Sequence, residues 1–239
     1  MISLSRVSVV PVISECERQE ALQVLRATYE REKRWVADGN QVFSPDDLDR
    51  FDVAWFLARR NREPVGVLRV LFNPPLAVYA QYGFQPVPGV NFDVAEFVKR
   101  RRVAEIGRFA VLPEHRKNHY IAAALMRAAA RDTLERGFTH YVTDIFEGEQ
   151  HSPYLFHTRV MGFEPVATHD VGELNCPNRR VTMVLDLQAA YRRLRRSGGW
   201  FFRYLTADWS EALHRRLVGE ETVLREDTSV PHFADAVLA

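Results

Sequence analysis

The chain has 239 residues, of which 46% are hydrophobic and 26% charged, and its formal net charge is +1. This composition is that of an ordinary globular protein, and it excludes a disordered or fibrous chain and a strong overall charge that would attract nucleic acid. With only two cysteines, Cys16 and Cys176, we expect no disulfide framework. The first residues do not match a signal peptide, and no segment has the roughly 18 apolar residues of a membrane span, so we expect a cytoplasmic protein.

The first half of the chain predicts one helix among several strands. Residues 5–14 alternate in a β-rich pattern, and Pro11 places that strand at a sheet edge. Residues 15–34 follow helical spacing with one broad apolar face. Residues 53–60 and 63–72 are β-patterned runs joined by a short polar turn, which predicts a hairpin. The stretch after this hairpin is broken by prolines and glycines and predicts no continuous element.

The second half alternates helices and strands. Residues 92–102 predict a short helix that ends in four basic residues. Residues 105–138 read as a strand, a charged turn and an Ala-rich helix. Next we expect a strand, a helix and a strand pair, at 139–146, at 152–161, and at 163–170 with 179–187. This order predicts an α/β protein with a mixed central β-sheet and helices on both faces.

The last fifty residues have a different pattern. From residue 188 the chain predicts two helices broken at Gly198 and Gly199. Their apolar stripe comprises Trp200, Phe201, Tyr204, Leu205, Trp209 and Leu213. We expect the stripe to pack on the main domain, with a membrane surface or a dimer interface as alternatives. The chain is therefore divided into a domain, 1–187, and a C-terminal helical extension with a loose tail, 188–239.

The charged turn at 113–120 contains no glycine. A helix N-terminus offers unpaired N–H groups and a partial positive charge, so this junction can bind an anion. The stretch "RFAVLPEHR", followed by the Ala-rich helix, "THYVTDIF" and "TRVMGFEPV", resembles the GNAT superfamily of acyltransferases. In that family the junction holds the pyrophosphate and pantetheine of acyl-CoA. The resemblance implies a GNAT-like N-acyltransferase fold with cofactor-binding residues Val111, Arg116, Lys117, Asn118 and His119.

The family motif has glycine or alanine where this chain has His119 and Ile121. The motifs "LRATYEREKRW", "DDLDRFD", "VGVLRVL" and "EIGRFAV" occur in an order similar to that of acyl-homoserine lactone autoinducer synthases and N-acyl amino acid synthases. In those families an acyl carrier protein brings the acyl group on a phosphopantetheine arm with one phosphate. The resemblance thus implies acyl carrier protein or acyl-CoA as the donor, with no permanently bound cofactor. It marks the substrate-binding residues Arg26, Trp35, Asp49, Asp52 and Arg69.

Amide formation from a thioester needs a base for the amine, donors for the oxyanion and a proton for the thiolate. Glu105 is the candidate base, unless it only pairs with a neighbouring arginine. On a regular strand Glu105 and Arg108 lie on opposite faces, but a bulge near Gly107 changes this. We expect the oxyanion donors among the backbone N–H groups from Phe109 to Val111, where the resembled fold parts its strands. The candidate catalytic residues are therefore Glu105, Arg108, Phe109 and Val111.

The proton donor for the thiolate stays open. Many GNAT enzymes use a Tyr four residues before a Gly-Phe pair, and here that position is Thr158. His157 and Tyr154 are possible substitutes, although a histidine on a helix surface is more often simply solvated. No pattern predicts a metal site.

The acids of residues 46–52 have two interpretations. With Ser44 they fit a helix start that has acids in its first turn. Alternatively, Asp49 and Asp52 hold Arg26 and Arg69 in a buried charge network that shapes the amine pocket, as the order of these residues in the resembled families implies.

Two further segments concern partners. The basic run 99–102 is either a solvated helix end or a docking site for an acidic carrier protein, whereas its shortness and lack of aromatics argue against nucleic acid. The apolar segment 72–92 either lines a channel for a fatty acyl chain or packs in the core.

The residues and the resemblance together predict an N-acyltransferase. It would move a medium- or long-chain acyl group from a carrier-protein or CoA thioester to an amino acid or similar small amine. The alternatives are an autoinducer synthase that uses S-adenosylmethionine, a GNAT enzyme that uses acetyl-CoA, and a non-catalytic acyl-binding or regulatory module.

Overall fold

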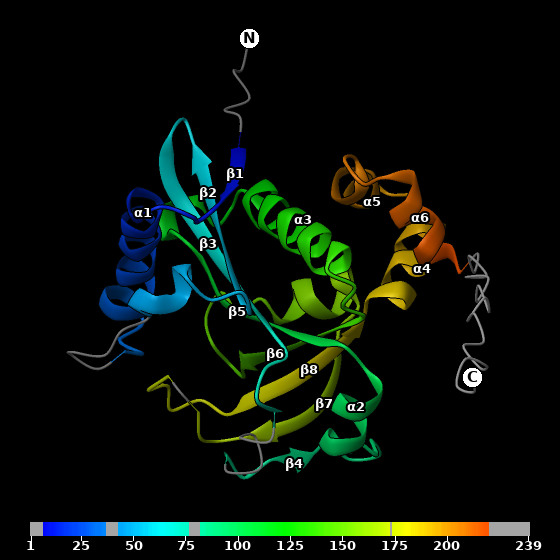
Figure 1. Cartoon of the computed structure of the whole chain (residues 1–239). Coiled ribbons are helices and arrows are strands. Elements are labelled where there is room, and N and C mark those ends of the chain that lie inside the picture. The colour runs from blue at the N-terminus through cyan, green and yellow to red at the C-terminus, as the bar shows by residue number, and fades with distance from the viewer. Residues whose placement is uncertain (1–6, 37–42, 77–81, 173, 220–239) are drawn as a thin grey trace, which may run out of the picture.

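A computed structural model describes residues 7–36, 43–76, 82–172 and 174–219. Within them lies one mixed eight-stranded sheet with the order β1-β2-β3-β5-β6-β8-β7-β4, covered by helices (Figure 1). The strands are β1 Val7–Pro11, β2 Val53–Arg60, β3 Glu63–Phe72, β4 Gln85–Pro86, β5 Val103–Val111, β6 His140–Phe146, β7 Glu164–His169 and β8 Arg180–Asp186. The helices are α1 Glu15–Leu25, α2 Val94–Arg100, α3 His119–Glu135, α4 Leu187–Ser197, α5 Trp200–Thr206 and α6 Glu211–Val218. The predicted α/β fold is confirmed.

Local sequence signals explain the first strands. β2 and β3 pair antiparallel, and both residues of their turn, Asn61 and Arg62, have positive φ, as tight hairpin turns require. β1 pairs with β2 at the edge of the sheet, where Pro11 with its missing N–H is tolerated. The predicted hairpin and edge strand are therefore confirmed.

Helices cover the two faces of the sheet with separate cores. Leu57 and Val67 pack with α1, whereas the neighbouring residues Phe56 and Leu68 pack in the cluster that contains α3. Successive side chains of a strand point to opposite faces, so α1 and α3 lie on opposite faces. We call these the α1 face and the α3 face.

The C-terminal helices pack on the α3 side of the molecule. Phe201, Leu205 and Leu213 are buried in the cluster that includes α3, so the expectation that the apolar stripe packs on the main domain is confirmed. The predicted second helix is two helices, α5 and α6, because Ser210 caps a new helix start. Among the described residues no helix has the length and apolarity to cross a bilayer.

The segment after the hairpin forms no long element in its described part. Leu76 is buried against Val103 and Val142, and only Gln85–Pro86 pairs with a strand, β7. The packing of Leu76 favours the core interpretation for this residue. Residues 77–81 of the predicted acyl channel lie outside the described residues.

Candidate active site

β5 and β6 run parallel but part after a short contact. Their backbones pair only over 103–105 and 140–142 within the described ladder. Beyond it, the Thr143 hydroxyl donates to the Ile106 carbonyl at 2.8 Å. A cavity of about 500 Å³ opens at this gap and is lined by residues of both faces. The strands therefore part as predicted, and the gap begins at residue 106.

Arg108 lies at a bulge in β5. Its φ of +50° is a left-handed conformation, which costs a non-glycine residue of order 1 kcal/mol. The pairing with β3 shifts here, between Val67 and Arg69. The strand is therefore not regular, the expected bulge near Gly107 is confirmed, and Glu105 and Arg108 both line the cavity.

Glu105 forms an ion pair with Arg69 at the cavity wall. The Arg69 Nη2 donates to Glu105 Oε1 at 2.7 Å, and both side chains are largely buried. The pair lies over Gly107, where an added Cβ would meet Glu105 Oε1 at 2.8 Å and Arg69 Nη2 at 3.2 Å. Only glycine leaves room for this arrangement. The carboxylate is thus both paired and exposed to the cavity, which combines the two interpretations from the sequence.

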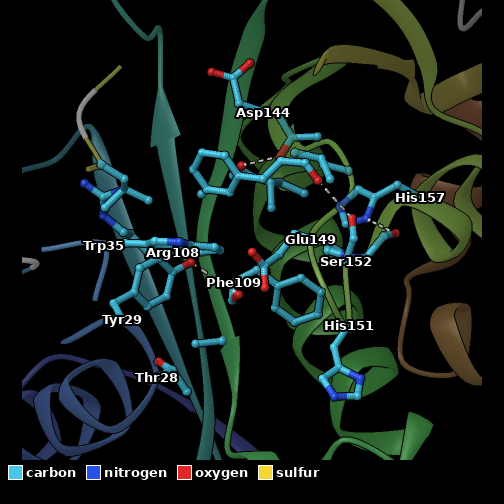
Figure 2. Close-up of a pocket in the computed structure, with 18 of the residues that line it drawn as sticks. Thr28, Tyr29, Trp35, Arg108, Phe109, Asp144, Glu149, His151, Ser152 and His157 are labelled. Carbon is cyan, nitrogen blue, oxygen red and sulfur yellow. Dashed lines mark hydrogen bonds between the residues drawn. The ribbon is translucent and has the colours of Figure 1, made fainter. Parts of the chain in front are cut away.

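Aromatic side chains form the wall on the α1 face. The helix after α1 widens into a π-helix, Arg26–Glu32, and carries Tyr29 into the cavity. The ring centroid of Trp35 lies 5.5 Å from that of Tyr29 and 4.4 Å from that of Phe146. Burial raises the pKa of Tyr29, although the nearby Arg108 opposes this. Figure 2 shows Tyr29, Trp35 and Arg108 together on one side of the pocket.

The Tyr29 phenol therefore stays neutral and is a hydrogen-bond donor, at 3.4 Å from the Phe109 carbonyl. The helical pattern of residues 15–34 includes Tyr29 and predicted only an apolar face for it. A tyrosine hydroxyl on a buried helix face usually has a hydrogen-bond partner, so the residue type itself could have indicated a polar contact here.

His157 lines the other side of the gap, next to Phe109. It is buried, with Nδ1 2.9 Å from the Pro153 carbonyl, and burial lowers its pKa to about 4. The expectation of a solvated histidine is therefore wrong. Because the carbonyl can only accept, Nδ1 carries the proton and Nε2 is an acceptor, so neutral His157 is a poor acid for a thiolate.

Tyr154, the other candidate acid, and Thr158, at the position of the family's Tyr, do not line the cavity. The Thr158 hydroxyl donates to the Tyr154 carbonyl, and the Tyr154 side chain is exposed. Neither of the two candidates in this stretch, His157 and Tyr154, is thus placed to give a proton to the thiolate.

The backbone N–H of Val111 points to the gap. The next N–H, that of Leu112, donates to the Val65 carbonyl on β3 at 3.0 Å, and successive N–H groups of a strand alternate in direction. On the same side as the Val111 N–H, Arg116 Nε donates to the Val111 carbonyl at 3.1 Å. An N–H at this place can stabilise a developing oxyanion, although this role stays a prediction.

The junction before α3 is less positive than its sequence indicates. Arg116 forms a two-pronged ion pair with Glu32, and this bond lowers the pKa of the Glu32 carboxyl. Asn118 caps α3 by accepting from the Tyr120 N–H at 3.2 Å. Arg116, Asn118 and His119 line the cavity, whereas Lys117 is exposed and does not.

The predicted network of acids and arginines is wrong. Arg26 and Asp49 are exposed, and neither lines the cavity. Asp52 pairs instead with Arg50 at 2.8 Å, two residues away, and Arg69 pairs with Glu105. The helix-start interpretation is confirmed, because Ser44 accepts from the backbone N–H of residue 46 at the start of Pro45–Leu48.

The cavity also includes acids that the sequence did not single out. Glu149 forms an ion pair with Lys33 and so joins the loop after β6 to the segment after α1. Asp144 projects from β6 at another part of the wall (Figure 2). In the described residues no group of three or more His, Cys, Asp or Glu side chains is arranged to hold a metal ion.

Comparisons with known proteins agree with this geometry. Residues 18–163, more than half of the chain, match the model of the acetyltransferase (GNAT) family. No curated protein sequence matches the chain.

Among solved structures, FeeM, an N-acyl amino acid synthase from uncultured soil microbes, superposes with a TM-score of 0.59 at 16% identity, over 78% of this chain and 94% of FeeM. NAA60 of Arabidopsis thaliana in complex with acetyl-CoA has a TM-score of 0.52 at 10% identity, over 76% and 98%. FdhC, a nucleotide-linked sugar GNAT, has 0.51 at 13% identity, over 82% and 95%. At these identities the likeness shows the fold alone.

Proposed function

The chain belongs to the acetyltransferase (GNAT) family, and from that premise we propose that it transfers a medium- or long-chain acyl group from a thioester to the amino group of an amino acid or similar small amine. The observation that carries this proposal is the cavity at the parted strands, with the Glu105 carboxylate at its wall and a backbone N–H at the gap. Its volume of about 500 Å³ lies within the range of small-molecule pockets, roughly 300–1,000 Å³.

The reaction follows from these groups. The acceptor ammonium gives a proton to Glu105, directly or through water, and the free amine attacks the thioester carbonyl carbon. The Val111 N–H stabilises the oxyanion that forms. The C–S bond then breaks, the amide nitrogen loses its second proton, and the thiolate takes up one proton. Arg69 holds the Glu105 carboxylate in a fixed orientation through the 2.7 Å bond.

Charge at the junction favours a donor with a single phosphate. Glu32 already neutralises Arg116, and the junction has no glycine for close approach to a pyrophosphate. A phosphopantetheine arm carries one phosphate and so needs less positive charge and fewer backbone contacts at this junction than the pyrophosphate of CoA. We therefore propose an acyl carrier protein as the preferred donor, and CoA as the weaker one.

The carrier would dock near Lys117 and not at the basic run 99–102. That run precedes β5 and the junction follows it, so the two are about 26 Å apart along the strand. Contact of the C-terminal helices with a membrane surface does not enter this proposal, because, within their apolar stripe, Phe201, Leu205 and Leu213 are buried, Tyr204 and Trp209 pack against the same core, and only Trp200 is exposed.

The acceptor class is proposed from chemistry and from likeness. Arg108 on the α1 face has the charge to attract the carboxylate of an amino acid, while Glu105 attracts its ammonium. FeeM, which has this fold, is an N-acyl amino acid synthase.

The test is release of free thiol from an acylated carrier protein, and from acyl-CoA, with a panel of amino acids and amines. Thiol release that depends on an amino acid supports the proposal, and no release with any pair contradicts it. Formation of methylthioadenosine from S-adenosylmethionine would identify an autoinducer synthase instead. Glu105→Gln should lower kcat by roughly 10²–10⁴-fold if Glu105 is the base, while a non-catalytic acyl-binding module would keep its affinity.

A further inference from the structure

At the cavity wall Asp144 is contacted by two buried polar side chains from neighbouring strands, and the proposed reaction uses none of the three. Asp144 of β6 and Thr182 of β8 are direct partners in the antiparallel ladder. The Thr182 hydroxyl donates to Asp144 Oδ1 at 2.6 Å. His169 Nε2, from β7, lies 3.1 Å from Asp144 Oδ2. Both carboxylate oxygens are therefore held in place.

Histidine 169 is a fixed support for this carboxylate. Its Nδ1 lies 2.7 Å from the Val171 carbonyl, which can only accept, so Nδ1 carries a proton. When the ring is protonated, the 3.1 Å contact between Nε2 and Asp144 Oδ2 is an ion pair. Burial alone would lower the pKa of His169, but the contact with Asp144, the Asp144 charge and the Val171 carbonyl together raise it. The side chain has no exposed surface and stacks on Tyr82, with centroids 5.8 Å apart.

Asp144 itself faces the cavity. Its side chain is 25% exposed and belongs to the lining, at the end of the pocket away from His151 in Figure 2. Each carboxylate oxygen has one acceptor position left after its present contact. The nearby Arg180 does not fill them, because it stacks on Phe146 and donates to the carbonyls of Asp170 and Leu174. This end of the cavity thus offers fixed hydrogen-bond acceptors.

We propose that Asp144, held by Thr182 and His169, is a specificity-determining subsite that binds a hydroxyl or ammonium group on the side chain of the acceptor. The inference rests on the proposed function in one respect, namely that an amine acceptor binds in this cavity. If an apolar side chain of the acceptor displaces water from Asp144, the carboxylate loses its hydrogen-bond donor, which costs binding free energy. Sites of this kind therefore bind an acceptor with a polar side chain more tightly than an acceptor of the same shape without the polar group.

Matched acceptor pairs test the subsite. Lysine with norleucine, tyrosine with phenylalanine, and threonine with valine differ only in the polar group or its replacement. Binding is measured by calorimetry, and kcat/KM by thiol release. We expect the wild type to prefer the polar member of at least one pair by about tenfold or more.

Asp144→Asn should reduce that preference to about threefold or less, mainly through binding. Thr182→Val keeps the carboxylate but removes its support, and should cause an intermediate loss. The matched control is Asp170→Asn, an exposed carboxylate close by that pairs with Arg179, and it should leave the preference unchanged. Thermal unfolding checks that each variant is folded. If Asp144→Asn does not fold, an unchanged preference in Thr182→Val overturns the proposal.

The outcomes are separable. Equal binding of both members of every pair by the wild type, or a preference that survives Asp144→Asn, overturns the subsite. A preference in binding that Asp144→Asn abolishes, without thiol release from any donor, supports the subsite and contradicts only the transferase proposal.

Discussion

Gly107→Ala is expected to damage the site without unfolding the protein. The new Cβ would lie 2.8 Å from Glu105 Oε1, about 0.6 Å inside the 3.4 Å at which ordinary contact begins. It would also lie 3.2 Å from Arg69 Nη2. The carboxylate must therefore rotate away, which breaks its 2.7 Å bond to Arg69 and moves its oxygen from the position that receives the amine proton.

A shift of this size is large for catalysis and small for stability. Misplacing a reacting group by about 1 Å can cost roughly 10²-fold in rate, so we expect kcat to fall by about 10- to 100-fold. Crowding costs about 1–3 kcal/mol, and replacing glycine in a strand recovers about 0.5–1 kcal/mol, so the fold should survive.

The assay is amine-dependent thiol release, with urea unfolding as the check on stability. Gly199→Ala is the matched control, because a Cβ there meets nothing within 4 Å, and its activity should stay at the wild-type level. If Gly107→Ala keeps more than half of the wild-type kcat, the fixed Glu105–Arg69 pair is not needed for the reaction.

Three further predictions concern charge and packing. Burial lowers the pKa of His157 to about 4 from an ordinary value near 6.5. Between these pH values the unfolded chain binds a proton that the folded chain does not. The free energy of unfolding should therefore fall by about 3 kcal/mol as the pH drops from 6.5 to 4. His157→Gln should flatten this part of the curve of unfolding free energy against pH, and an unchanged slope would contradict the assignment. Glu32→Gln removes the ion-pair partner of Arg116. In calorimetry at low salt this variant should bind CoA several-fold more tightly, while its affinity for pantetheine stays unchanged. Equal effects on both ligands would mean that Arg116 does not face the phosphates. Leu205→Ala should lower the free energy of unfolding by about 2–5 kcal/mol, because this side chain is buried. The control Leu155→Ala, at a side chain that is 56% exposed, should change it by less than about 0.5 kcal/mol. Equal small effects would mean that α5 does not pack on the domain.

Several elements were predictable because their signals are local. The alternation of 53–60 and 63–72, the proline in β1 and the acids after Ser44 each act within a few residues, and the structure uses them as expected. The parting of β5 and β6 followed from a resemblance in motif order. Glycine 107 also indicated the bulge, although the left-handed residue is its neighbour Arg108.

The ion pairs were not predictable in this way. Arg69 bonds to Glu105, 36 positions further along the chain, and Arg116 bonds to Glu32, 84 positions earlier. The nearer acids Asp49 and Asp52 face solvent or a local partner instead. Sequence spacing does not state which strands will be neighbours, so it cannot choose among several acids of equal chemistry.

The elements, their order and the types of side chain available could be predicted from local patterns, because hydrophobic period, turn residues and caps act over one or two turns of chain. Which groups meet in the cavity depends on the packing of remote segments. Pairing of β8 with both β6 and β7 brought Asp144, Thr182 and His169 together. Folding also buried His157 and placed Glu32 beside Arg116. Burial and the distances between remote residues arise only when the sheet has formed.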